Sequence, residues 1–321
     1  MIYLKRFSFP SLSEECDFLH PGDSLGADRR PLFHTGSFYP FNVLPYVSLN
    51  KIEFDSITIL YGENGCGKTT ALNIIAEKLR VKRDSLFNSG RFLNDYLDMC
   101  KYNEDDFREY AQFFNHNSRI ITSDDIFNLS MKKREFNKQL FSKTKDVNEE
   151  YWEIRAGSPN LQSLEDYDRW HTRYEALKSK SAFLKKRLER EEEENSNGET
   201  AIQYFIKQME NEGLYLLDEP ENSLSLENQI KLADHINSSA RFFNYQFIIA
   251  THSPIFLSIP HAKIYNLDDD SKVVDSWTKL KSVRLMFDLF MKHKKEFEKK
   301  RFIVSFTCTM KQNKNEIFRM T

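Results

Sequence analysis

Short apolar runs separated by long polar stretches set the pattern of this chain. Four of the runs are rich in β-branched or aromatic residues and end in polar or glycine-bearing turns, as buried parallel strands do. They span residues 57–61, 214–217, 246–250 and 263–267. The first two are far apart in the sequence. The pattern therefore predicts an α/β fold with a mainly parallel central sheet and a long insertion.

The stretch at 81–195 has few glycines or prolines and many Lys, Glu, Arg, Asn and Phe residues, which predicts a mainly helical insertion. Within it, residues 167–194 place apolar side chains three, four or seven positions apart, the spacing of one helix face. That face either covers a hydrophobic seam of the protein itself or docks a partner. Residues 282–301 predict a C-terminal helix packed on the sheet, and nucleic-acid contact through its basic end is the alternative.

Composition and charge narrow the class of protein. The 321 residues include 46 Lys plus Arg and 48 Asp plus Glu, so the net charge of -2 gives no global electrostatic argument for a dedicated nucleic-acid binder. No apolar run approaches the roughly 20 residues that cross a bilayer, and no secretion signal is apparent. The scattered cysteines lack the spacing of a zinc site. These features predict a cytoplasmic chain with reduced thiols and no membrane partner.

A glycine-rich loop follows the first predicted strand. Residues 62–70 read GENGCGKTT, which contains the phosphate-binding Walker A pattern G-x-x-x-x-G-K-[ST], and a helical pattern follows. Glycines let consecutive backbone N–H groups point at phosphate oxygens, and a helix N-terminus adds its positive end. The predicted ATP-binding residues of this loop are Gly62, Asn64, Gly65, Cys66, Gly67, Lys68, Thr69 and Thr70.

Three side chains of the loop have predicted chemical roles. Lys68 is expected to act in catalysis by reaching the β- and γ-phosphates, and the Thr69 hydroxyl is the expected magnesium ligand. Cys66 lies near a helix N-terminus, where thiol pKa values tend to fall. We therefore expect a thiol alkylator to block ATP binding and bound ATP to protect the thiol.

The second predicted strand ends in two adjacent acids, Asp218 and Glu219, within the sequence LYLLDEPE. Successive side chains of a strand face opposite ways, so the two acids should diverge at the edge where parallel sheets place ligands. This Walker B arrangement predicts that Asp218 binds magnesium and that Glu219 is catalytic, polarising the attacking water. His252 follows the third strand, and we predict that it donates to the γ-phosphate or orients that water.

The motifs GENGCGKTT, LYLLDEPEN and IIATHSP together resemble those of the ABC ATPase superfamily. They look most like small soluble ATPases of the structural-maintenance-of-chromosomes and RecF-like branch. The resemblance covers residues 39–80 and 196–267. It implies an ABC-ATPase head with a mainly parallel central sheet, an N-terminal antiparallel β portion and a helical insertion, with ATP and Mg²⁺ as cofactors of ATP hydrolysis.

The resemblance also implies a shared ATP site. Residues 195–200 look like a divergent ABC signature loop, with Ser196 and Gly198 at its most informative positions, and an ordinary serine-capped helix start is the alternative. In the family this loop completes the ATP site of a second subunit, which implies a head-to-tail homodimer. Tyr39 either stacks on the adenine or belongs to the core. Asp124 is a candidate for the residue of the family's glutamine loop.

These elements predict four parts of the chain: an N-terminal ATPase lobe at 1–80, the insertion at 81–195, a C-terminal ATPase lobe at 196–281, and a C-terminal helix and tail at 282–321. The leading interpretation is an ATP-gated switch for a separate effector, a nuclease or toxin, in phage defence or DNA repair. That output comes from the resemblance alone. A clamp that binds DNA directly is the alternative, and a transporter motor subunit is a third hypothesis.

Overall fold

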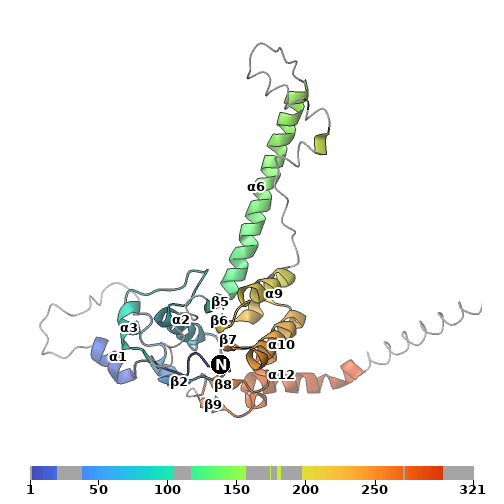
Figure 1. Ribbon diagram of the computed structural model, residues 1–321. Coiled ribbons are helices and arrows are strands. Elements are labelled where there is room, and N and C mark those ends of the chain that lie inside the picture. The colour runs from blue at the N-terminus through green and yellow to red at the C-terminus, as the bar shows by residue number, and fades with distance from the viewer. Residues whose placement is uncertain are drawn as a thin grey trace, which may run out of the picture.

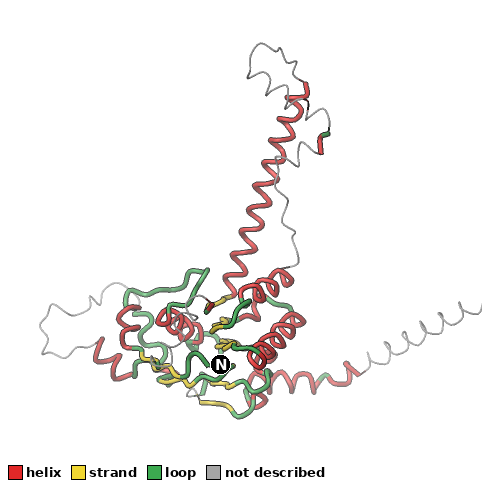
Figure 2. The backbone as a smooth tube through the Cα atoms, viewed as in Figure 1, coloured by secondary structure: helices red, strands yellow, loops and turns green. Residues whose placement is uncertain are grey.

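The computed structural model describes residues 2–19, 38–103, 117–156, 174, 179–181, 197–269 and 272–298. Within these ranges the chain forms a mixed α/β head from which one long helix, α6 (Ser123–Ala156), projects (Figure 1). The colouring of Figure 2 separates the strands of the head from the helices around them.

A six-stranded sheet forms the centre of the head, in the order β5-β6-β7-β3-β8-β9. Neighbouring strands pair in parallel from β5 to β8, and only β9 is antiparallel to its neighbour. The strands are β3 (Ile57–Tyr61), β5 (Arg119–Thr122), β6 (Gly213–Asp218), β7 (Tyr245–Thr251), β8 (Lys263–Asn266) and β9 (Lys272–Val274). Strands β3, β6 and β7 are buried along their whole length, which explains their continuous apolar runs. The predicted α/β fold with a mainly parallel central sheet is confirmed.

A smaller antiparallel sheet supports the head at its N-terminal side. It has the order β2-β1-β4 and consists of β1 (Arg6–Ser8), β2 (Lys51–Glu53) and β4 (Lys101–Tyr102). This sheet is the N-terminal antiparallel portion that the family resemblance implied. Strands β4 and β5 both come from the stretch whose composition predicted a mainly helical insertion, so residues 81–122 contribute strands to the two sheets of the head.

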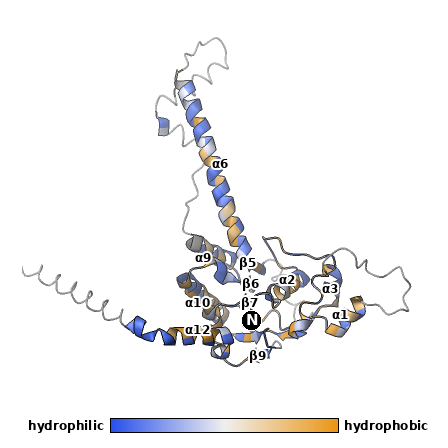
Figure 3. Cartoon of the chain, turned by 180° about the vertical axis from the view of Figure 1, so that it is seen from behind, coloured by the Kyte–Doolittle hydropathy of each residue, from blue (hydrophilic) through white to orange (hydrophobic). Residues whose placement is uncertain are grey.

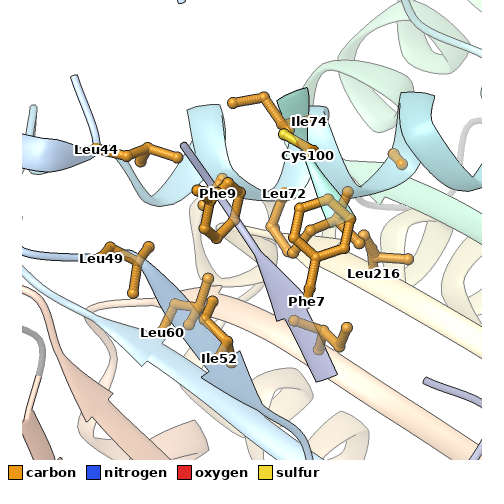
Figure 4. Close-up of a cluster of buried hydrophobic side chains, with 14 of the residues drawn as sticks. Phe7, Phe9, Leu44, Leu49, Ile52, Leu60, Leu72, Ile74, Cys100 and Leu216 are labelled. Carbon is orange, nitrogen blue, oxygen red and sulfur yellow. The ribbon is translucent and has the colours of Figure 1, made fainter. Parts of the chain in front are cut away.

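Helices and loops cover both faces of the central sheet. Leu60 and Leu216 point to the face covered by α2 (Lys68–Leu79) and the small sheet. Figure 4 shows part of the cluster of buried apolar side chains on this face. Ile59 and Leu217 point to the opposite face, which α9 (Asn197–Gln208) and α10 (Leu226–Phe242) cover. This alternation is the period of two expected for strands buried on both sides. The remaining helical elements are α1 (Leu12–Leu19), η2 (Pro45–Val47), α3 (Leu93–Met99), η3 (Pro220–Ser223), α11 (Pro254–Leu257), η4 (Trp277–Lys279) and α12 (Lys281–Lys292).

Helix α6 is continuous over 34 residues and is about 50 Å long. It begins directly after β5, and its base packs against η3 and α9. Figure 3 shows that its outer part is largely hydrophilic. The amphipathic stretch predicted at 167–194 lies outside the described residues except for 174 and 179–181. Among the helices that the structure describes, none has both the length and the apolar character to cross a bilayer.

The predicted C-terminal helix exists as α12, but it does not pack on the sheet as expected. Val283 is its only buried residue, whereas Leu285, Phe287 and Phe290 are exposed. The helix follows β9 at the edge of the sheet, so that only its first turn reaches the core. Figure 3 shows apolar colouring along α12 and hydrophilic colouring in the residues after it.

Gln246 joins the N-terminal segment to the central sheet. Its side chain is fully buried in β7, and its Oε1 accepts hydrogen bonds from the backbone N–H groups of Tyr3 and Leu4, both at 2.9 Å. Its Nε2 donates to the carbonyl oxygens of Leu4 at 2.8 Å and Asp55 at 3.2 Å. One side chain therefore satisfies four backbone groups that would otherwise lie unpaired in the core.

Substituting Leu for Gln246 should lower the free energy of unfolding by roughly 3 kcal/mol, because buried backbone groups would lose their partners. Urea unfolding followed by circular dichroism would measure this. The control is Gln203→Leu on the exposed side of α9, which should change stability by no more than about 0.5 kcal/mol. Equal effects of the two substitutions would contradict the role of Gln246.

Candidate active site

The glycine-rich loop connects β3 with α2 and depends on two glycines in the left-handed region. Gly65 has φ of 88° and Gly67, which caps α2, has φ of 93°. Side chains with a Cβ rarely adopt these values. A Cβ on Gly67 would also lie 3.1 Å from Leu44 Cδ2 and 3.2 Å from Val43 Cγ1, so the N-terminal lobe closes the loop on this side. The loop can therefore present its amides at the start of a helix, where anions bind.

Lys68 lies inside the mouth of this loop. Its side chain is 3% exposed, and its Nζ is 3.8 Å from Glu219 Oε1. Nζ donates to the carbonyl oxygens of Gly62 at 2.7 Å and Glu63 at 3.0 Å. These carbonyls hold the ammonium group where an incoming phosphate would meet it.

Thr69 and Asp218, the two predicted magnesium ligands, are in direct contact. The Thr69 hydroxyl donates to Asp218 Oδ1 at 2.9 Å. Burial raises the pKa of Asp218 to about 7, and the neighbouring carboxylate of Glu219 acts in the same direction. The Thr69 hydrogen bond and Lys68 oppose this shift. Asp218 is thus a buried acid that titrates near neutral pH.

Glu219 turns away from Asp218 through a left-handed backbone, with φ of 46° and ψ of 53°. Such a conformation costs a non-glycine residue roughly 1–3 kcal/mol and often marks a functional site. The Glu219 N–H donates to Ala250 O at 2.9 Å, and Asn222 Nδ2 donates to Glu219 Oε2 at 2.8 Å. The two adjacent acids therefore have separate surroundings, one against Thr69 and the other near Lys68.

His252 follows β7 at the same edge of the sheet. Its side chain is 46% exposed, and its Nδ1 lies 3.2 Å from Oε1 of Glu221, which is buried. Glu221 was not among the residues predicted from the sequence. The only sign of Glu221 in the sequence is that it is a third acid just after the Walker B pair, and acids are common in such turns.

The structure places the other predicted residues as follows. Tyr39 donates its hydroxyl to Thr70 Oγ1 at 3.4 Å. Asn64 is exposed at the rim of the loop. Gly198 lies in the first turn of α9, whereas Ser196 lies outside the described residues. Asp124 is exposed at the start of α6.

Asp125, the neighbour of Asp124, is the acid that turns inward. It is 5% exposed, and its Oδ2 accepts a hydrogen bond from Thr122 N at 2.7 Å. The sequence pattern of a strand followed by polar residues correctly located the turn at the end of β5. It could not show which of the two adjacent acids is buried.

A cavity of about 840 Å³ lies beside the loop and was not predicted. Its lining includes Tyr46, Glu63, Cys66 and Asp268. Both carboxylate oxygens of Asp268 accept the Glu63 N–H, at 2.9 and 3.1 Å. Because β3 stands between β7 and β8, this cavity lies on the side of the loop away from the Walker B acids. Asp268 is far from the loop in the sequence. The only sign of its place here was that it is a polar residue just after β8, the strand next to β3.

The expectation that the pKa of the Cys66 thiol is lowered was wrong. Burial raises the pKa of the Cys66 thiol, and this outweighs the opposing effect of Lys68. The helix N-terminus favours a thiolate only where the sulfur is well solvated or paired, whereas this sulfur lies in the partly buried wall of the loop.

Cys66 should therefore react slowly for a thiol at a helix N-terminus. At pH 8 iodoacetamide should label exposed Cys16 on α1 before Cys66, because the thiolate is the reacting form. Peptide mapping by mass spectrometry at timed intervals would measure both rates, with buried Cys100 as an internal control. Faster labelling of Cys66 than of Cys16 would contradict this interpretation.

No curated protein matches the chain. Among solved structures, the head domain of a structural-maintenance-of-chromosomes protein from Thermotoga maritima is 12% identical, with 83% of this chain and 94% of that chain covered and a TM-score of 0.37. The corresponding head from Pyrococcus furiosus, bound to the C-terminal domain of ScpA, is 14% identical over 74% of this chain and 94% of that chain, with a TM-score of 0.35.

A dimeric bacterial ABC transporter cassette is 15% identical, with 71% of this chain and 88% of that chain covered and a TM-score of 0.33. The family assignment rests on a different comparison. The model of the family described as ABC transporter matches residues 47–222, which is more than half of the chain and includes both the glycine-rich loop and the Walker B acids. The chain therefore belongs to the ABC transporter family of ATP-binding ATPases.

Proposed function

We propose that the protein binds ATP with Mg²⁺ at the glycine-rich loop and hydrolyses it between two copies of the chain. The observation that carries the proposal is the hydrogen bond of 2.9 Å between Thr69 and Asp218. It unites the N-terminus of α2, which suits phosphates, with the carboxylate that ends β6. Oxygen ligands of these two kinds are those that Mg²⁺ prefers.

The donor set fits magnesium better than a metal held by the protein alone. Within the described residues, no group of three or more His, Cys, Asp or Glu side chains could hold a metal ion. Mg²⁺ usually takes one or two protein ligands and completes its shell with phosphate oxygens and water. When bound, it would neutralise charge on the β- and γ-phosphates.

The residues of the site then have distinct tasks. Loop amides around Gly65 and Gly67 hold the phosphates, and Lys68 transfers its hydrogen bonds from the loop carbonyls to phosphate oxygens. Glu219 is 24% exposed and close to Lys68, so its carboxylate can polarise a water that enters from the open side. Asn222 restrains that carboxylate through its hydrogen bond.

The cavity beside the loop suits the ribose and base of the nucleotide. A triphosphate that points its γ-phosphate toward β6 and β7 must direct its other end toward β8, which is where the cavity lies. Tyr46 lines the cavity and is 74% exposed. It is therefore a second candidate, besides Tyr39, for stacking on the base.

We include a second copy of the chain in the proposal because one side of the site is open to solvent. Asn64 and Gly65 are exposed, and so is part of Glu219. A signature loop with Ser196 and Gly198 from a partner in head-to-tail orientation would close this side, as the resemblance implies. The expected output remains an ATP-gated signal to an effector protein, a nuclease or toxin, in phage defence or DNA repair, with α6 as the projecting element that can receive a partner.

Two substitutions test the proposal. Lys68→Ala should abolish ATP binding because the buried ammonium is lost, whereas Glu219→Gln should bind ATP but hydrolyse it about 10²- to 10⁴-fold more slowly and accumulate as a dimer. Calorimetry, phosphate release and light scattering would measure these results. Lys231→Ala, at an exposed lysine of α10, is the matched control. Unchanged nucleotide affinity of Lys68→Ala would refute the proposal.

Magnesium binding should depend on pH through Asp218. Because this acid keeps its proton up to about pH 7, protons compete with the metal below that value and affinity rises with pH. Between pH 6 and pH 8 the affinity for ATP in Mg²⁺ should increase about tenfold. The increase should be clearly smaller in EDTA and with Asp218→Asn, because only ionisation of the ATP phosphates then remains, and the same pH dependence with and without Mg²⁺ would contradict it.

A further inference from the structure

Glu221 is a buried acid that contacts both Thr251 and His252 through one carboxylate oxygen. It lies in η3 and is 7% exposed. Its Oε1 accepts hydrogen bonds from the Thr251 hydroxyl at 2.6 Å and from the backbone N–H of His252 at 2.8 Å. The same oxygen lies 3.2 Å from Nδ1 of the His252 ring. One oxygen of Glu221 therefore holds the backbone of His252 by a hydrogen bond and lies beside its ring.

This contact determines which ring nitrogen of His252 is free for a ligand. A carboxylate oxygen accepts hydrogen bonds and repels the lone pair of an unprotonated nitrogen, so its position 3.2 Å from Nδ1 favours a ring with hydrogen on Nδ1. The ring is then fixed with Nε2 as the nitrogen that can meet a nucleotide. The 46% exposure of the side chain leaves this part of the ring accessible.

A second contact restrains the loop from the other side. Ser253 donates its hydroxyl to Gln229 Oε1 at 2.8 Å, and Gln229 Nε2 donates to the carbonyl oxygen of Leu224 at 3.1 Å. Gln229 lies on α10, directly after the turn that carries Glu221. The residues on both sides of His252 are therefore tied to the segment that follows Walker B.

We propose that Glu221 is the positioning residue of His252: it fixes the ring and its Nδ1–H tautomer so that Nε2 faces the γ-phosphate. The proposal rests on the proposed ATPase function. Glu221 acts through His252 and does not touch the reacting atoms. Because Glu219 caps the same short helix, this segment sets the positions of the carboxylate near the water and of the histidine near the phosphate.

If Glu221 had a purely structural role, it would only join η3 to β7 through Thr251 and the backbone N–H of His252. Such a role would not need the imidazole ring of His252, whereas the positioning role does. If Glu221 acts through His252, removing its charge should matter only while the histidine is present. If it only supports the fold, the loss should be the same with or without the histidine.

A double-mutant cycle in the full-length protein makes this comparison. Glu221→Gln keeps the side-chain volume and an acceptor oxygen but removes the charge. At saturating ATP it should lower kcat roughly 10- to 100-fold, as loss of the carboxylate that orients a metal-ligating histidine does, while the Kd for ATP stays nearly constant. In the His252→Ala background the same substitution should lower kcat by less than about twofold.

The control for the charge change is Glu227→Gln, at an exposed carboxylate of α10 that pairs with Lys231. It should leave kcat unchanged. Thermal unfolding by circular dichroism would show that all variants are folded. An equal loss of kcat from Glu221→Gln in both backgrounds would overturn the proposal.

The ring tautomer gives a readout that does not need hydrolysis. Nitrogen-15 NMR of the nucleotide-free protein, with His252 assigned from the His252→Ala spectrum, should show hydrogen on Nδ1 in the wild type. Glu221→Ala should remove this preference. A wild-type ring with hydrogen on Nε2 alone would overturn the proposal. An absence of ATP hydrolysis with the expected tautomer would instead count against the proposed function.

Discussion

The alignment of two strands against β7 is the constraint on which the site depends. Leu60 of β3 and Asp218 of β6 are both paired with Ala250, on opposite edges of the same strand. The glycine-rich loop and the Walker B acids therefore begin at the same level of the sheet, with one strand between them. A slip of one residue would turn the buried side chains of β6 to the other face and remove Asp218 from Thr69.

The lysine of the loop and the two Walker B acids each have a hydrogen-bond partner within the protein. Lys68 is bonded to carbonyls of its own loop, Asp218 to Thr69, and Glu219 to Asn222. Burying charges without partners would be costly, and these local hydrogen bonds reduce that cost. These hydrogen bonds are also few. They can therefore be exchanged for bonds to phosphate and metal, as binding of a nucleotide at this site requires.

The fold and the contact between the glycine-rich loop and the Walker B acids could be predicted from the sequence because both follow from local patterns. A buried strand, a glycine-rich turn and a helix start are consecutive at residues 57–79, and their chemistry follows from their order. Asp268, Tyr46 and Glu221 were missed because their neighbours are set by tertiary contact. Asp268 meets Glu63 only because β8 pairs with β3, and Glu221 meets His252 only because η3 lies against the end of β7. The pKa of Cys66 was misjudged for the same reason, since its burial depends on the packed loop.

The contacts of η3 also connect the site with the projecting helix. This short helix carries Glu221 and is capped by Glu219, and it packs against the base of α6. Helix α6 in turn starts where β5 ends, and β5 pairs with β6 up to Asp218. A movement of η3 that repositions Glu219 or His252 must therefore either shift the base of α6 or disrupt its packing. Since a continuous helix moves as a rigid element, a small rotation at its base becomes a larger displacement along its length of about 50 Å. The chain thus has a short physical connection between the carboxylates at the sheet edge and the outer part of α6.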